Sequence, residues 1–333
     1  YNAPAVCDEI DSQDGKNTFN LDDSSANILS GLPANNLSIS YYENANDALL
    51  ETNALTSPYE NTIAYNQTLY VRVENDNACY GINNVYLTVN PLPQLEEDET
   101  ILYCLNEFPT TVTLDAGLND TPSNYTFNWS NGETTESIQV NTIGNYTVTV
   151  SNNTTGCSAS RSITIIPSNT ATIEDIEIID GSLNNNQVVV ITSGEGEYQY
   201  ALQNENGNTT PFQTNNVFTQ LPAGIYSIKV RDVKNNCGEI EQDLSIIGFP
   251  LFFTPNGDTI NDTWQVYGVS SVFQPNSEIL IFDRFGKLIT QIKPSGRGWD
   301  GTFNGLPLPQ SDYWFSVTLQ DGRIYRNHFT LKR

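Results

Sequence analysis

The sequence predicts an all-β chain built from tandem antiparallel β-sandwiches. Asn, Thr, Ser and Gly are abundant, and between them run short stretches in which apolar and polar residues alternate. Val85–Val89 and Gly144–Val150 show this alternation clearly, and it is typical of strands that bury one face. Only Asn46–Leu55 favours a short helix. No run reaches about 18 apolar residues, so no membrane-spanning helix is expected.

Three stretches of the chain share a plan, which indicates an internal repeat. The alternating strand Gly144–Val150, which precedes Cys157, recurs as Gly224–Asp232, which precedes Cys237. Turn-rich segments and prolines separate the stretches. The sequence therefore predicts four domains, at residues 1–91, 92–167, 168–247 and 248–333.

The net charge of −25 is unevenly distributed along the chain. Residues 1–247 hold 6 Lys and Arg against 32 Asp and Glu, whereas residues 248–333 hold 8 against 7. An acidic surface keeps a secreted protein soluble and repels nucleic acid, so no nucleic-acid partner is expected. The near-neutral last domain is a different kind of module.

The five cysteines indicate disulfide bonds rather than a metal site. None lies in a Cys-x-x-Cys motif, and the chain has a single His, so zinc is not expected. The spacing favours one bond within each of the first two domains, Cys7–Cys79 and Cys104–Cys157. Cys237 is left free, either as a small buried apolar residue or, if exposed, for a bond to another chain. Disulfides of this kind form in an oxidising compartment outside the cytoplasm.

Metal binding and catalysis find little support in the sequence. Asp8, Asp11 and Asp14 have the composition of a calcium loop, but their spacing is not that of an EF-hand and no Glu closes the loop. A solvated acidic turn is the default interpretation, and no other cofactor is expected. The chain has no Gly-x-Ser-x-Gly elbow and no phosphate-binding Gly loop. We therefore expect no enzymatic activity.

The most highly specified stretch is the loop at the start of the last domain, residues 252–264. Pro255 fixes φ, Gly257 permits positive φ, and the Asn and Asp side chains can bond back to the backbone. Such a loop matters for recognition or for shape, and these two interpretations stay open.

Ordered motifs of the last domain resemble a known family. Phe-Thr-Pro-Asn-Gly-Asp at 253–258 is followed by Asn-Asp-x-Trp at 261–264, and later by Ile-Phe-Asp-Arg-Phe-Gly-Lys at 281–287 and Gly-Trp-Asp-Gly at 298–301. Residues 249–333 thereby resemble the type B C-terminal sorting domain of the type IX secretion system, also called the gliding-motility-associated C-terminal domain. The strand around Tyr146 resembles immunoglobulin-like and PKD-like modules of secreted proteins. The resemblance implies that the following residues form a partner-binding sorting motif: Phe253, Thr254, Pro255, Asn256, Gly257, Asp258, Asn261, Asp262, Trp264, Trp299, Asp300 and Gly301.

The resemblance also implies a function, a location and partners. The chain would be the C-terminal fragment of a large cell-surface adhesin, exported across the outer membrane, and its lack of Met agrees with a fragment of a longer protein. Its partners would be the outer-membrane type IX translocon and a PorP/SprF-like β-barrel anchor, in a system linked to gliding motility. The alternative is a carbohydrate-binding accessory region of a secreted polysaccharide hydrolase, with a surface glycan as ligand. Trp299–Gly301 and Asp312–Trp314 would suit sugar stacking, although core and turn roles explain them as well.

Overall fold

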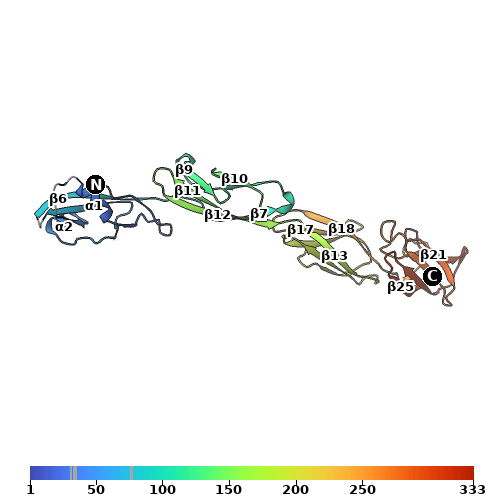
Figure 1. The fold of residues 1–333 in the computed structure, drawn as a ribbon. Helices are drawn as coiled ribbons and strands as arrows, with labels where there is room; N and C mark the ends of the chain where they lie inside the picture. The colour runs from blue at the N-terminus through green and yellow to red at the C-terminus, as the bar shows by residue number, and fades with distance from the viewer. Residues whose placement is uncertain (31, 33–35, 76–77) are drawn as a thin grey trace. The chain divides into compact units, whose positions relative to one another are not determined.

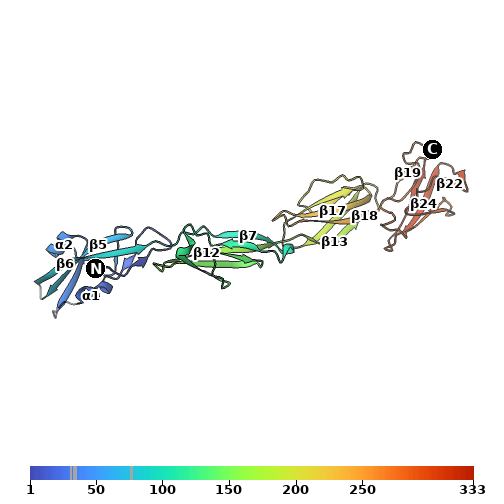
Figure 2. The same cartoon turned by 90° about the horizontal axis from the view of Figure 1, so that it is seen from above.

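A computed structural model describes residues 1–30, 32, 36–75 and 78–333, with side chains at all of these except 78–80. The predicted all-β fold is confirmed, because sheets carry every domain and helices are few (Figures 1 and 2). The chain divides into two compact units. Unit 1 contains Tyr1–Ile101 and Pro109–Ile166, and unit 2 contains Leu102–Phe108 and Pro167–Arg333.

The N-terminal part of unit 1 packs a four-stranded sheet, in the order β1-β6-β5-β3, and a β2-β4 pair around one apolar core. Helix α2 begins where the side chain of Asn44 accepts the backbone N–H of Asp47 at 2.9 Å, which caps the helix. Its bounds fall near the expected helix at 46–55. The elements are β1 Val6–Cys7, β2 Thr18–Phe19, α1 Asp22–Leu29, β3 Leu37–Tyr42, α2 Ala45–Leu50, β4 Tyr59–Glu60, β5 Asn66–Asn75 and β6 Ala78–Asn90.

The following segment forms a sandwich of a four-stranded sheet, β7-β12-β11-β9, and a β10-β8 pair. Trp129 is 2% exposed, and its indole Nε1 donates to the carbonyl of Thr135 at 2.8 Å, which satisfies the polar atom of a buried ring. The elements are β7 Glu99–Cys104, η1 Leu105–Glu107, β8 Val112–Asp115, η2 Pro122–Asn124, β9 Tyr125–Trp129, β10 Ser137–Val140, β11 Gly144–Asn152 and β12 Ser158–Ser168.

Residues after β12, in unit 2, form a sandwich of two three-stranded sheets, β13-β14-β16 and β15-β17-β18, around a separate core. The buried Asp232 follows β17, and its carboxylate accepts the backbone N–H groups of Glu197, Lys234, Asn235 and Cys237. Desolvation opposes this charge, but the N–H of Cys237 and the other donors outweigh it and lower the pKa of Asp232. The strands are β13 Thr172–Ile179, β14 Asn186–Ser193, β15 Tyr198–Asn204, β16 Val217–Leu221, β17 Gly224–Asp232 and β18 Glu239–Ile246.

The last domain has a five-stranded sheet, β19-β25-β24-β20-β21, and a small β22-β23 pair. One face of the large sheet is covered by an aromatic core, and β21 pairs with β20 alone along the described chain. The strands are β19 Phe252–Phe253, β20 Glu278–Phe282, β21 Leu288–Ile292, β22 Thr302–Phe303, β23 Leu306–Pro307, β24 Ser311–Thr318 and β25 Ile324–Leu331.

The disulfide pairing differs from the sequence prediction. Cys7 bonds to Cys157 and Cys104 bonds to Cys237, so the predicted pairs Cys7–Cys79 and Cys104–Cys157 were wrong, as was the free Cys237. The prediction assumed that each disulfide forms within one sandwich. Instead, Cys7 in β1 bonds to Cys157 in the loop before β12, and Cys104 at the end of β7 bonds to Cys237 in the loop before β18. The side chain of Cys79 lies outside the described residues. None of the described helices is long and apolar enough to cross a membrane.

Candidate recognition site of the C-terminal domain

The loop that follows β19 is organised by the carboxylate of Asp262. Its Oδ1 accepts the backbone N–H of Gly257 at 2.7 Å and of Asn256 at 3.0 Å, and its Oδ2 accepts the N–H of Thr259 at 2.7 Å. The donor at Gly257, followed by those at Thr259 and Asn256, lowers the pKa of Asp262. One ionised carboxylate therefore holds three backbone donors of the loop in place.

The other polar residues of the loop bond to each other. The side chain of Asn256 donates to Asp258 at 2.9 Å and accepts the backbone N–H of Asp258 at 3.1 Å. The other carboxylate oxygen of Asp258 accepts the N–H of Ile260 at 2.8 Å, and the N–H of Thr254 donates to the carbonyl of Asn261 at 2.7 Å. The bonds from the N–H groups of Asp258 and Ile260 to the side chains two residues earlier are Asx turns, which fix loop shape locally.

The aromatic motif residues lie in the core. Phe253 and Trp264 are 0% exposed and Trp299 is 4% exposed. The ring of Trp264 stacks on Phe329 with centroids 4.2 Å apart, and its Nε1 donates to the carbonyl of Pro250 at 2.9 Å. Burying rings of this size stabilises the domain strongly, and each indole N–H has a partner.

The two parts of the motif meet through a short β-bridge. The backbone N–H of Trp264 donates to the carbonyl of Trp299 at 2.9 Å, and the reverse bond measures 2.8 Å. Gly301 adopts φ +80°, and a Cβ there would lie 2.7 Å from Leu331 Cδ1, so this corner requires glycine. The exposed Asp300 accepts both the N–H and the hydroxyl of Thr302 through Oδ1.

The structure divides the predicted motif by exposure. The aromatic residues and Gly301 are buried, whereas Asn256, Gly257, Asp258, Asn261 and Asp300 are exposed at the surface. Thr254, Pro255 and Asp262 are half-buried. The side chains of Asn256 and Asp258 engage neighbours within the loop. Their geometry therefore accounts for shape, and a direct contact with a partner stays a prediction.

A groove follows the free edge of β21 beside the second half of the motif. Its volume is about 510 Å³, and it lies between the strand residues 289–292 and the segment 296–304. Trp299 and Asp300 line it together with Lys293 and Arg297, which are both exposed. An unpaired strand edge offers N–H and C=O groups to an added strand. No local pattern in the sequence marks β21 as an edge strand, because strand order is set by the tertiary fold.

The outer face of the large sheet forms a second, broader hollow of about 860 Å³. Trp314 is 40% exposed there and lies 6.0 Å from the ring of His328, whereas Tyr313 on the same strand is buried in the core. The alternation along β24 sends neighbouring residues to opposite faces. The predicted core role therefore holds for Tyr313 and Trp299, and Trp314 is open to solvent.

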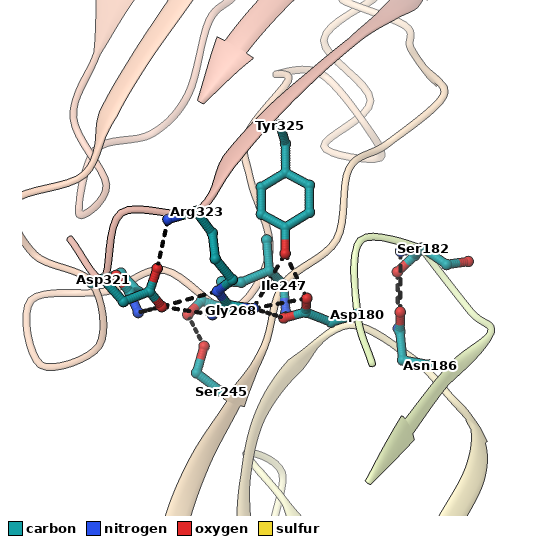
Figure 3. Close-up of polar contacts among 10 residues, drawn as sticks. Asp180, Ser182, Asn186, Ser245, Ile247, Gly268, Asp321, Arg323 and Tyr325 are labelled. Carbon is teal, nitrogen blue, oxygen red and sulfur yellow. Dashed lines mark hydrogen bonds and ion pairs between the residues drawn. The ribbon is translucent and has the colours of Figure 1, made fainter. Parts of the chain in front are cut away.

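Within unit 2, Asp180 joins the residues after β13 to the last domain (Figure 3). Its side chain is 3% exposed and accepts from Arg323 Nη1 at 2.9 Å, from the Tyr325 hydroxyl at 2.7 Å and from the N–H of Ile247 at 3.0 Å. Burial and the bond to Asp180 raise the pKa of Tyr325 to about 12. Ser245 also donates its hydroxyl to the carbonyl of Gly268. No local sequence pattern marks the contacts of Asp180, because its partners are more than 60 positions away in the chain.

The acidic residues proposed for calcium have other roles in the structure. Asp8 is buried, and its two carboxylate oxygens accept the N–H groups of Glu9 and Gly15 at 2.9 and 3.0 Å. Asp14 accepts the N–H of Lys16, and Asp11 is exposed. Among the described residues no group of three or more His, Cys, Asp or Glu is placed to hold a metal ion.

Comparisons with known proteins match two parts of the chain to families. Residues 247–330 match the CHU_C Type IX secretion signal domain, and residues 4–93 match the Flavobacterium inter-domain disulphide bond domain. The resemblance to a type IX sorting domain is confirmed, and the chain is a secreted protein exported across the outer membrane to the cell surface. No curated protein matches the chain.

Among solved structures, immunoglobulin domains 1–5 of Sidekick-1 are 12% identical with a TM-score of 0.33, covering 100% of this chain and 79% of that one. The I67–I69 fragment of titin is 10% identical with a TM-score of 0.32, covering 74% and 95%.

Proposed function

We propose that this chain is part of a larger adhesin-like surface protein and that its last domain binds outer-membrane components by strand addition at β21. The sandwiches before it act as an interaction and spacer region, without catalysis. The partners are the type IX translocon and a PorP/SprF-like β-barrel anchor, in a surface system linked to gliding. The motif residues would act chiefly by building the domain that presents this edge.

The observation that carries the proposal is the free edge of β21 beside Trp299 and Asp300. An added strand gains backbone hydrogen bonds along such an edge, and side chains lining the groove select its sequence. Lys293 and Arg297 flank the groove, so an acidic or polar strand of the partner fits it best. The loop organised by Asp262 supports the position from which β19 enters the sheet, because Thr254 follows that strand directly.

Photo-crosslinking tests this assignment on the full chain. A photoreactive residue replaces Gln291 on β21, Ser316 on the outer sheet face, or Gln203 on β15 as a control in another domain. Each protein is exposed to outer membranes of the native host, and crosslinked proteins are identified by mass spectrometry. We expect an outer-membrane barrel to be captured from position 291 only. Capture from position 316 alone would overturn the role of the β21 edge and move recognition to the outer face.

A pair of charge reversals provides a second test. Arg297→Glu lies in the β21 groove and Arg326→Glu lies on the outer sheet face, and both side chains are exposed. We expect the first to weaken barrel binding about fivefold, equivalent to about 1 kcal/mol, and the second to leave it unchanged. The reverse result would contradict the proposal. Polysaccharide binding by the full chain without capture of any barrel would instead support the carbohydrate-binding accessory role.

A further inference from the structure

The two disulfide bonds enclose overlapping parts of the chain. Cys7–Cys157 spans 150 residues and Cys104–Cys237 spans 133, and each enclosed segment contains one end of the other bond. Three chain segments therefore run between the same two covalent junctions: 7–104, 104–157 and 157–237. Bonds closed within single domains would not create such parallel segments.

We propose that these overlapping bonds have a mechanical function. They limit how far residues 7–237 extend when the protein is under tension. A pulling force enters this region at Cys7 and leaves it at Cys237. Because all three segments connect the two junctions, the shortest becomes taut first and keeps the other two slack. The segment 104–157, which holds strands β8 to β11, would carry the load.

The segment lengths give the size of the effect. The segments 7–104, 104–157 and 157–237 contain 97, 53 and 80 residue steps. A fully extended chain spans about 3.5 Å per residue, so the two junctions separate by at most about 185 Å. Without the bonds, the 230 steps from Cys7 to Cys237 would extend to about 800 Å. The two longer segments could therefore not be fully extended.

The surroundings of the bonds favour their persistence. Cys104, Cys157 and Cys237 are all less than 9% exposed, so reductants reach them poorly. Asp232 accepts the N–H of Cys237 at 3.0 Å, and Asn235 donates from its side chain to the carbonyl of Leu102, so the loop around the second bond is fixed on both sides. Export across the outer membrane places them where disulfides are stable. This inference does not depend on how the last domain is recognised.

Single-molecule force spectroscopy on the full chain tests the proposal. Fused tags serve as handles at both ends, and Cys79→Ser is present throughout so that only four cysteines remain. The measured quantity is the total contour length gained when the chain unfolds, in oxidising buffer and after a thiol reductant. The 96 residues after Cys237 contain no cysteine and serve as an internal length standard.

We expect reduction to add about 620 Å, from 177 newly released residues. Cys7→Ser with Cys157→Ser should add about 155 Å, and Cys104→Ser with Cys237→Ser about 95 Å. These gains sum to far less than the effect of losing both bonds, which is the signature of parallel segments. Reduction of the parent chain keeps the test valid if a variant folds poorly.

Other results would overturn the proposal. A gain on reduction that differs clearly from about 620 Å, or a gain of about 620 Å from either double variant, would show that the two bonds do not enclose overlapping segments. A contour length that does not change on reduction would show that the bonds do not limit extension. Extension of the oxidised chain well beyond about 185 Å between the two junctions would lead to the same conclusion.

Discussion

The carboxylate of Asp180 lies 2.9 Å from Arg323 Nη1, although the two residues are 143 positions apart. The same carboxylate accepts the hydroxyl of Tyr325 and the backbone N–H of Ile247, while Arg323 also pairs with Asp321 at 2.8 Å. Phe249 adds apolar contact, with its ring stacked 4.6 Å from Phe315 and 5.1 Å from Tyr325. The sorting domain therefore continues from β18 through packed residues rather than through a free linker.

Asp180→Ala should destabilise the last domain by about 2–3 kcal/mol, because it leaves three donors without their buried acceptor. Asp321→Ala removes the exposed partner of the same Arg323 and should cost about 0.5 kcal/mol. Three of the four Trp residues lie in the last domain, so Trp fluorescence during denaturant unfolding reports its stability. Equal effects of the two substitutions would show that Asp180 contributes no more than a surface charge.

The raised pKa of Tyr325 predicts that the protein loses stability at alkaline pH. Its pKa is raised from 10.0 to about 12 by burial and by the hydrogen bond to Asp180, so the folded state retains a proton that the unfolded chain releases. This contribution is fully present below pH 10 and is lost as the pH rises through about 12. Tyr325→Phe should flatten the fall in stability between these pH values, measured as the difference from the parent chain. An unchanged pH profile would contradict the assigned role of the phenol.

Two glycines of the sorting motif should differ sharply in their tolerance of alanine. Gly301 and Gly257 have φ of +80° and +82°, so both substitutions strain the backbone by about 1 kcal/mol. A Cβ at Gly301 would lie 2.7 Å from Leu331, whereas nothing lies within 4 Å of one at Gly257. Gly301→Ala should therefore cost about 2–4 kcal/mol in total and Gly257→Ala about 1. Thermal unfolding of both variants measures this difference, and similar values would show that the corner at 301 relaxes freely.

The loop after β19 should resist mild acid. The N–H groups of Gly257, Thr259 and Asn256 lower the pKa of Asp262 below its ordinary 3.8, so the loop keeps its hydrogen bonds above that pH and loses them as the pH falls through the lowered value. NMR chemical shifts of the Gly257 and Thr259 amides should stay constant down to about pH 4 and move below it. Asp262→Asn should abolish this titration. A midpoint above 3.8 in the parent chain would contradict the hydrogen-bonded geometry.

Strand positions in the last domain were predictable because its alternation is regular. β25 at Ile324–Leu331 follows the turn signal Asp321-Gly322, and that turn is closed by a hydrogen bond from Gly322 N–H to the carbonyl of Leu319. Helix α1 was missed, because Asp22–Leu29 has two Ser and an Asn, which are poor helix formers, and no side-chain cap marks its start. Its stability comes from tertiary burial of Ile28, which is 2% exposed.

The sorting motif was predictable as a set of residues, but which of them are buried and which are exposed was not. Spacing alone could not tell that Trp299 faces the core while Asp300 faces solvent, because the corner at Gly301 interrupts any strand alternation. The pairing of Trp264 with Trp299 brings together positions that are distant in sequence. The free edge of β21 likewise depends on the strand order of the sheet, in which β20 is the described neighbour of β21.

The sequence by itself determined the all-β class, the acidic composition of residues 1–247 and the identity of the last domain as a type IX sorting signal, because these follow from local alternation, composition and ordered motifs. Only the tertiary structure decided how the cysteines pair and how Asp180 reaches Arg323. Both depend on distances between residues more than 130 positions apart, which are set by the packing of whole sandwiches. The sequence shows where a cysteine or an aspartate stands, but the tertiary fold determines which residue it contacts.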